Sequence, residues 1–356
     1  MYTDLRKAFD SVPHDLLLKK LKAIGIRDKN LAWLTDYLKG RRQRVVINGT
    51  YSEYVDVESG VPQGGVLSGI LFSVYISDLP EVIKHCNISL YADDAKLYAP
   101  TNNDHDIRLV QRDIDALTQW CEKWRLRLSM EKCFFLQYNG RNVKNPVIPT
   151  YQINGHTLER KHEAVDLGIT ITDDLKFHQH IDKVSKSTRS EIGRIRRSFV
   201  TRRPNFLQDL FKTYVRPNIE YCVNVWNPCY KTDIDKLERV QNRFTRLLKF
   251  SSVMTPAERN NCIKISTHEK RRERGDLIGI FKFMDSTDLL KKKTTGSSRT
   301  NHTRSLELQR YNTNVRKHSF AIRSIHLWNQ LPEEVVLSKS LNEFKTKLDK
   351  HIRDTT

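Results

Sequence analysis

Two adjacent aspartates between two β-rich runs constrain this chain more than any other feature. Residues 88–99 read ISLYADDAKLYA, and Asp93 and Asp94 stand where a strand–turn–strand pattern turns. Neighbouring residues of a strand face opposite sides, but a turn can bring both carboxylates toward one cation. Two close carboxylates resist joint ionisation unless a cation compensates them. The segment therefore predicts a cation site at a hairpin tip, and the alternative is a plain turn, in which Asp is common.

A third carboxylate, Asp4, stands in a short β-rich start, ahead of the helix that Pro13 opens. Carboxylates from separate strands are what a two-metal phosphoryl-transfer site requires, because the two ions activate the attacking hydroxyl and stabilise the leaving oxygen. Magnesium is the expected metal, since it prefers one or two carboxylates together with substrate phosphates. Phe9 follows five residues later and could shape a nucleotide pocket, the alternative being ordinary core packing.

A glycine-rich loop precedes a largely apolar helix in the same region. Residues 60–68 read GVPQGGVLS, and apolar residues continue to 76. Free amide groups at the start of a helix suit phosphates, and glycine permits a close approach. The other predicted elements are helices at 14–24, 28–39 and 106–125, a hairpin at 43–57 around Asn48-Gly49, and strands at 133–138, 150–153 and 164–170.

The charge of the chain is concentrated in its second part. The 356 residues carry 61 Lys and Arg against 42 Asp and Glu, a net charge of +19, of which only +1 falls within residues 1–140. Such an asymmetry favours a polyanion partner, first nucleic acid and second an anionic membrane. The alternative is a set of solvated helix faces. The candidate arginines are Arg189, Arg194, Arg196, Arg197, Arg202, Arg203, Arg239, Arg243 and Arg246.

The longest apolar run, about residues 66–76, is too short to span a bilayer. No basic start followed by an apolar stretch indicates a secretory signal. The sequence therefore predicts a protein that is not secreted, and nucleic acid rather than a membrane is its expected partner.

Taken in order, four segments resemble the polymerase core of reverse transcriptases, most of all those of non-LTR, jockey-like retrotransposons. The segment YTDLRKAFDSVPH (2–14) is similar to the first catalytic motif and GVPQGGVLSGILF (60–72) to the nucleotide- and template-binding motif. LYADD (90–94) resembles the catalytic hairpin, and RLRLSMEKC (125–133) resembles the motif whose lysine lies near the incoming triphosphate.

The resemblance implies an α+β fold. Residues 1–183 would form a polymerase palm, an antiparallel sheet with helices, and residues 184–290 a mainly helical basic thumb or connection. A linker at 291–310 and a small C-terminal module at 311–356 complete the expected organisation. In this family the fingers and the endonuclease precede the first motif, so a palm without its fingers, in an N-terminally truncated chain, is expected.

The resemblance also implies a location in the nucleus, or otherwise in the cytoplasm, and an activity, that of an RNA-directed DNA polymerase. Such a nucleotidyltransferase adds dNTPs to the 3′-OH of a DNA primer on an RNA template, with two Mg²⁺ ions. Asp4, Asp93 and Asp94 match the metal-binding catalytic carboxylates, Lys132 the general acid for pyrophosphate, Phe9 the gate against a ribose 2′-OH, and Gln63 and Gly64 the contacts to nucleotide and template. Arg194, Arg196, Arg197, Arg202, Arg203, Arg239 and Arg243 are the expected contacts to nucleic-acid phosphates.

Three positions depart from the family pattern. Gly65 stands where serine is usual, Gly69 where proline is usual, and Ser129 where asparagine is usual. Two alternatives to the DNA polymerase follow from the sequence. One is a truncated remnant that binds nucleic acid without catalysis, and the other, disfavoured by Phe9, is a polymerase that makes RNA.

Overall fold

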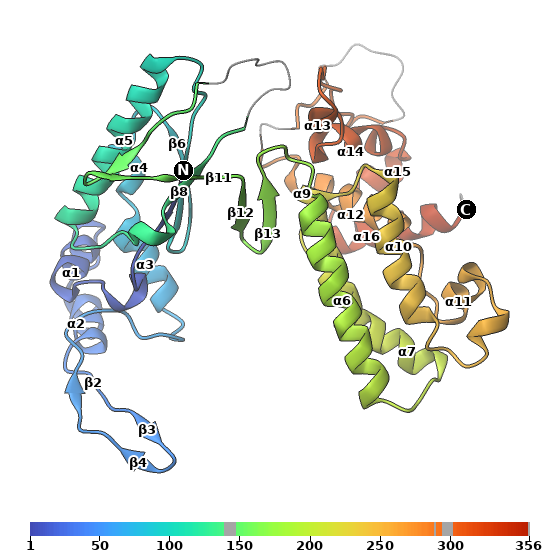
Figure 1. The fold of residues 1–356 in the computed structure, drawn as a ribbon, viewed down its shortest axis with the longest axis horizontal. Coiled ribbons are helices and arrows are strands. Elements are labelled where there is room, and N and C mark those ends of the chain that lie inside the picture. The colour runs from blue at the N-terminus through green and yellow to red at the C-terminus, as the bar shows by residue number, and fades with distance from the viewer. Residues whose placement is uncertain (139–146, 288–289, 294–301, 355–356) are drawn as a thin grey trace. The chain divides into compact units, whose positions relative to one another are not determined.

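A computed structural model gives the fold and describes residues 1–138, 147–287, 290–293 and 302–354. The chain forms two compact units, Met1–Glu163 and Ala164–Thr356, and each is taken by itself (Figure 1). The sequence predicted this boundary later, after residue 183. The expected α+β class is confirmed, because the first unit contains a five-stranded sheet with helices and the second is mainly helical.

The first unit alternates short strands with helices. In chain order they are β1 (Tyr2–Asp4), α1 (His14–Ala23), α2 (Asp28–Leu38), β2 (Arg42–Gln43), β3 (Val46–Ile47), β4 (Thr50–Tyr51), β5 (Val55–Asp56), α3 (Ser68–Ile76), α4 (Leu79–Val82), β6 (Asn87–Tyr91), β7 (Asp94–Tyr98), α5 (Asp104–Lys123), β8 (Phe134–Leu136), β9 (Gln152–Ile153), β10 (His156–Thr157) and β11 (Glu159–Lys161). The predicted Asn48-Gly49 turn is confirmed, with both residues at positive φ between β3 and β4.

The main sheet has the order β11-β8-β1-β7-β6, so the first strand of the chain lies in its middle. β1 pairs antiparallel with β7 on one side and β8 on the other, whereas β11 pairs parallel with β8. Side chains alternate between the two faces, since Thr3 and Leu5 are buried while Tyr2 and Asp4 are half-buried. The position of β1 therefore decides where Asp4 lies.

The buried face of the sheet packs against helices. Leu97 of β7 and Phe135 of β8 join one apolar cluster with Leu17 of α1, Phe72 of α3 and Ile114 of α5. Figure 1 shows α4 and α5 gathered beside this sheet. The helix predicted at 106–125 is confirmed as α5, and its apolar side faces the core, because Val110, Ile114, Leu117 and Cys121 are all buried. The opposite face, which carries Asp4, is left for other partners.

One buried cation connects the helices of this unit. The Lys20 ammonium on α1 donates to the Asp78 carboxylate at 2.6 Å and lies 3.6 Å from the centre of a Trp124 ring. The Trp120 indole donates to the same Asp78 oxygen at 3.0 Å. Burial lowers the pKa of Lys20, and Asp78 opposes that shift. The ion pair thus joins residues from three separate stretches of the chain.

The hairpin of β12 (Glu163–Asp166) and β13 (Ile169–Thr172) lies at the start of the second unit, except that the first residue of β12 is the last of the first unit. Its helices are α6 (His178–Ser198), α7 (Pro204–Leu210), α8 (Arg216–Glu220), α9 (Val223–Trp226), α10 (Lys231–Thr245), α11 (Pro256–Cys262), α12 (His268–Phe283), α13 (Asn314–Lys317), α14 (Phe320–Asn329), α15 (Glu333–Val336) and α16 (Leu341–Asp354), with a π-helical turn over Phe211–Val215. α6 packs along α10 and is 21 residues long. Within the described residues, no helix is both long and apolar enough to cross a bilayer.

The C-terminal helices share a core with α12. Ile280 of α12 lies in one apolar cluster with Trp328 of α14 and Phe344 of α16. Part of the stretch predicted as a linker, 291–310, belongs to this core. Leu306 is fully buried, its amide donates to the Asn329 side chain at 2.9 Å, and the Trp328 indole donates to the carbonyl of Arg304 at 2.9 Å. Residues 294–301 of that stretch lie outside the described residues.

A buried carboxylate on α5 offers a test of the first unit. Asp113 accepts hydrogen bonds from the backbone amides of Lys84, His85 and Cys86 at 3.1, 2.7 and 2.6 Å. Burial opposes ionisation, but these three amides outweigh it and hold the pKa of Asp113 below its usual range. Asp115, two residues on, is exposed and bonds only to Gln111 among the recorded hydrogen bonds.

We expect Asp113→Ala to lower the free energy of unfolding by about 3 kcal/mol, because it leaves three amides without their acceptor. Asp115→Ala should change it by less than about 0.5 kcal/mol. Because the folded-state pKa is depressed, the contribution of Asp113 is present above its usual pKa and disappears as the pH falls through the lowered one. Urea unfolding and hydrogen exchange of amides 84–86 measure this, and equal stability of the two variants would contradict it.

Candidate active site

Asp4 and Asp94 face each other across the centre of the sheet. They are direct partners in the antiparallel pairing of β1 with β7, followed by Thr3 with Ala95 and Tyr2 with Lys96. Directly opposed residues project to the same face, with Cβ atoms about 4.5–5.5 Å apart. The two carboxylates therefore share the face that the helices leave open.

Asp93 occupies the adjoining turn. The sequence predicted both aspartates at the hairpin tip, but the turn consists of Ala92 and Asp93, and Asp94 is already the first residue of β7. The tight connection requires φ of +51° at Ala92, in the left-handed region. Asp93 is half-buried and Asp94 is exposed. The register of β7 thus assigns the two aspartates different positions.

Lys132 completes the cluster from a distant part of the sequence. Residues 127–129 run beside β1, since the Arg6 amide donates to the Arg127 carbonyl at 2.7 Å and the Ser129 amide to the Asp4 carbonyl at 2.8 Å. A single 3-10 turn, Met130–Lys132, follows. It brings the Lys132 ammonium 3.2 and 3.3 Å from the two carboxylate oxygens of Asp4. Lys132 is two-thirds exposed, so this ion pair contributes little to stability.

The donor set of this site suits Mg²⁺ when a phosphate substrate is present. Among the residues that the structure describes, no group of three or more His, Cys, Asp or Glu side chains could hold a metal ion by itself. The structure instead brings Asp4 and Asp94 together as a pair, and two carboxylates suffice where substrate phosphates complete the coordination. The ammonium bound to Asp4 indicates that the site attracts cations.

The glycine-rich loop is fixed against the segment that follows β1. The Gly60 amide donates to the Val12 carbonyl at 2.8 Å, and the Val61 amide donates to the Phe9 carbonyl at 2.8 Å. Gly60 has φ of +86°, and a Cβ there would lie 2.7 Å from the Asp10 backbone. Only glycine permits this approach, so Gly60 sets the distance between the loop and the first motif.

The predicted nucleotide contacts lie on this loop and beside it. Gln63 donates through its side-chain amide to the Asp10 carboxylate at 2.9 Å, and both residues are exposed. Gly64 has φ of +77° and open space around it. Phe9 stacks on Phe72 of α3 with ring centres 4.6 Å apart, and it remains half-buried. Phe9 is thus held by the core while part of its surface stays accessible.

Two of the three departures from the family pattern have a local explanation. A Cβ at Gly65 would lie 2.6 Å from the Tyr37 hydroxyl oxygen and 2.8 Å from the Ser68 hydroxyl oxygen, so serine there would displace both groups. Ser129 acts through its backbone, which bonds to Asp4 and Lys132, so its side chain need not be asparagine. Gly69 has open space around it, and nothing in the structure explains that departure.

The predicted phosphate-binding arginines, all in the second unit, separate into groups. Arg194 is paired with Glu191, and Arg202 donates to the carbonyls of Arg196, Phe199 and Thr201 at the end of α6. The remaining five are exposed. Two of them line a cavity together with Arg189 and Arg246, which are also among the candidate arginines of the sequence analysis. The five are Arg196, Arg197, Arg203, Arg239 and Arg243, and the two cavity residues are Arg239 and Arg243.

Sequence reasoning did not single out Asp10 or Gly60 in this site. Asp10 holds Gln63, and Gly60 holds the loop against the first motif. The signal for Gly60 was its place at the start of a glycine-rich loop, but the identity of its contact partner depends on the tertiary fold. Asp10 lies next to Phe9 in the first motif and carried no spacing signal of its own.

Comparison with known proteins defines the class of the N-terminal part of the chain. Residues 1–171 match the family model described as "Reverse transcriptase (RNA-dependent DNA polymerase)". This part of the chain is therefore a reverse transcriptase domain, and the sequence resemblance is confirmed.

The relatives specify the kind of reverse transcriptase. The chain is 28% identical over 260 residues to the RNA-directed DNA polymerase from mobile element jockey of Drosophila funebris, covering 69% of this chain and 28% of that protein. It is 28% identical over 265 residues to the probable RNA-directed DNA polymerase from transposon BS of Drosophila melanogaster, covering 70% of this chain and 28% of that protein. The domain is thus related to the polymerases of non-LTR elements, and the match spans just over a quarter of their length.

Gly60 gives a prediction for the geometry of the site. We expect Gly60→Ala to push the loop away from residues 9–12 and to lower the free energy of unfolding by more than about 2 kcal/mol, through a backbone clash added to an unfavourable φ. Gly155→Ala is the control, because Gly155 has φ of +80° and open space. It should lose only about 1 kcal/mol. Urea unfolding of both variants measures the two losses. Equal losses of unfolding free energy would show that the backbone clash at Gly60 is absent.

Proposed function

We propose that this chain supplies the catalytic part of an RNA-directed DNA polymerase, adding dNTPs to a primer 3′-OH. The observation that carries the proposal is the pairing of Asp4 with Asp94 on the open face of a reverse transcriptase domain, with Lys132 on the Asp4 carboxylate. In the reaction, the 3′-oxygen bonds to the α-phosphorus, the α–β phosphoanhydride bond breaks, the hydroxyl loses its proton and pyrophosphate gains one.

Asp4 and Asp94 would hold Mg²⁺, and Asp93 would add a carboxylate from the turn. Bound there, a pair of Mg²⁺ ions would activate the 3′-hydroxyl and neutralise charge on the leaving pyrophosphate. The strands contribute rigidity, because the antiparallel register fixes the separation of the two carboxylates before substrate arrives.

Lys132 would donate the proton that pyrophosphate needs. In the free protein its ammonium is held by Asp4, but the pair is exposed and contributes less than about 1 kcal/mol. Lys132 could leave Asp4 at little cost when that carboxylate serves as a metal ligand, and the triphosphate would attract its ammonium. Lys132 would thus have two partners in succession, first the Asp4 carboxylate and then the triphosphate.

Phe9, Gln63 and Gly64 would form the nucleotide pocket. Phe9 is held by its stack on Phe72 and by the Val61 amide that donates to its carbonyl. Its ring would therefore keep its position and exclude a 2′-hydroxyl. Gln63 is oriented by Asp10, and the open space at Gly64 lets a nucleotide or template base approach the backbone.

The partners would be an RNA template and a DNA primer. We propose the second unit as the thumb-like part that follows the palm, with its basic helices contacting backbone phosphates. Phosphate contacts position a duplex but carry no sequence information, which suits a polymerase that copies any template. We propose the nucleus or the cytoplasm as the location, where the protein would meet its nucleic-acid partners.

Primer extension tests the proposal. With a poly(rA) template, an oligo(dT) primer and Mg²⁺, we expect Asp93→Ala and Asp94→Asn to lower the extension rate by at least about 1,000-fold, because several kcal/mol of transition-state stabilisation are lost. Asp36→Asn, at an exposed carboxylate of α2, should retain the full rate. Salt-sensitive binding by the wild type without extension would instead support the noncatalytic remnant.

Phe9 gives a separate prediction on sugar choice. Phe9→Val should raise the ratio of NTP to dNTP incorporation by at least about tenfold, because a smaller side chain leaves room for the 2′-hydroxyl. Tyr98→Val, at an exposed aromatic residue of the same unit, should leave the ratio unchanged. A ratio in Phe9→Val equal to that of the wild type would remove Phe9 from this role.

A further inference from the structure

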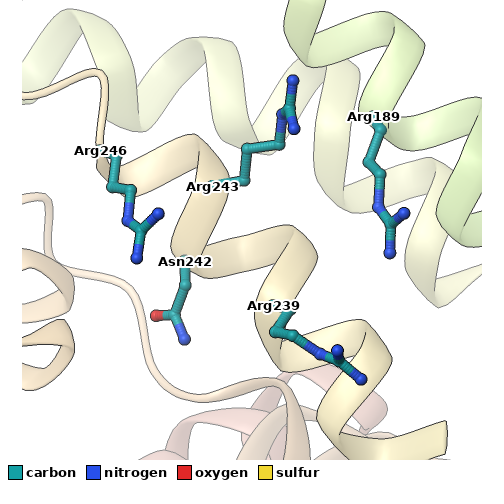
Figure 2. A pocket seen from close by; sticks show the side chains of 5 residues that line it. All are labelled: Arg189, Arg239, Asn242, Arg243 and Arg246. Atoms are coloured by element: carbon teal, nitrogen blue, oxygen red, sulfur yellow. The ribbon is translucent and has the colours of Figure 1, made fainter.

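A cavity in the second unit is lined almost entirely by arginine. It has a volume of about 310 Å³ and is bounded by Arg189 of α6, by Arg239, Asn242 and Arg243 of α10, and by Arg246 just after that helix. Figure 2 shows these side chains spread over the two neighbouring helices. All four arginines are exposed, so a ligand in the cavity is open to solvent.

The helix geometry explains why the arginines gather. Arg239, Arg243 and Arg246 are spaced by four and three residues, which places them on one side of α10 and its C-cap, Arg246. The opposite face carries Leu237, Val240 and Phe244, all fully buried. The apolar face therefore fixes the rotation of α10 and holds the arginine face outward, where α6 adds Arg189.

Within the described part of the chain, these four arginines have no carboxylate partner, unlike six other arginines of this unit. Among the described residues, none of the four makes an ion pair, and only Arg239 has a recorded side-chain hydrogen bond, to the carbonyl of Asp235 at 3.1 Å. By contrast, carboxylates pair with Arg194, Arg216, Arg271, Arg274, Arg304 and Arg323. Four like charges around one cavity repel each other, and an anion in the cavity would relieve that repulsion.

We propose that this arginine pocket binds two adjacent backbone phosphates of one nucleic-acid strand. The guanidinium fork matches phosphate oxygens, and Asn242 adds a neutral donor. From Arg239 to Arg246 the helix rises about 10 Å, which is long enough for more than one phosphate. The volume equals that of about ten water molecules, which leaves room for two phosphates with bridging water.

The inference rests on the proposed function only in taking nucleic acid as the partner. It goes further by assigning the grip to Arg189, Arg239, Arg243 and Arg246, and by excluding Arg194 and Arg202, which have partners within the protein. A free phosphate ion would offer the same chemistry, so the experiment includes it as a separate ligand.

Binding of a labelled RNA–DNA hybrid, measured by fluorescence anisotropy without dNTPs over about 0.05–0.3 M NaCl, tests the pocket. Arg239→Gln/Arg243→Gln should weaken binding about tenfold at about 0.1 M salt, with the loss fading as salt rises. The charge-matched control Lys350→Gln/Arg353→Gln, on the exposed side of α16, should weaken it less than about twofold. Equal losses in the two double variants would overturn the proposal.

Replacing all four arginines by glutamine tests whether they share phosphates. The slope of log K against log salt should become shallower by about two, the number of phosphates in the pocket. A change of about four would mean four independent surface contacts and would overturn the pocket, as would no change. Thermal unfolding of each variant checks its fold, and the double variant decides the question if the quadruple variant does not fold.

Two further measurements distinguish backbone-phosphate binding in this pocket from binding of a free anion and from polymerase activity. Inorganic phosphate at millimolar concentration should neither raise the unfolding temperature of the wild type nor displace the hybrid. If phosphate stabilised the wild type but not the quadruple variant, while the quadruple variant still bound the hybrid normally, the pocket would be a free-anion site instead. Asp36→Asn, the exposed control on α2, should bind the hybrid as tightly as the wild type, and because this assay contains no dNTPs it does not depend on catalysis. The polymerase proposal can thus fail in the extension assay while the pocket stands, and the reverse holds equally.

Discussion

The antiparallel pairing of β1 with β7 is the constraint on which the first unit depends. It places a three-residue strand between β8 and β7 and fixes Asp4 opposite Asp94. The same pairing buries Thr3, whose hydroxyl donates to the Ala95 carbonyl at 2.8 Å. Because side chains alternate along the strand, burial of Thr3 and Leu5 requires Asp4 to face the other way. A slip of one residue would exchange the two faces, so the apolar core and the charged site are specified by the same hydrogen bonds.

Around that pairing, the site is built from two further segments that return to β1. Residues 127–129 run beside it and deliver Lys132, and the loop at 60–64 closes on residues 9–12 through Gly60. The Gln63 side chain adds one bond to Asp10, and backbone groups make the bonds at Gly60, Val61, Arg127 and Ser129. Side chains at these positions are therefore free to differ from the family pattern, as Ser129 does, whereas Gly60 is not, because its missing side chain is what permits the contact.

Much of this could be predicted from the sequence, and the remainder could not for identifiable reasons. The long helix α5 and the Asn48-Gly49 hairpin were predictable, because a buried stripe and a positive-φ turn are local signals. The position of Asp94 within β7 was not, since it depends on the register with β1. Leu306 and its neighbours resembled a linker because short polar segments carry little apolar signal, yet here buried hydrogen bonds hold them. The arginine stripe of α10 was visible, but only helix packing adds Arg189.

Lys20 has a consequence for how the first unit assembles. Its ammonium, carried by α1, contacts the Tyr75 carbonyl of α3, the Asp78 carboxylate at the start of α4 and the Trp124 ring at the end of α5. An intermediate that buried Lys20 before Asp78 was in place would hold a charge without its counter-ion, which costs several kcal/mol. Partly assembled forms are thereby disfavoured, and folding of these helices is coupled into one cooperative event. A single polar contact in the interior thus helps to make the unit fold all at once.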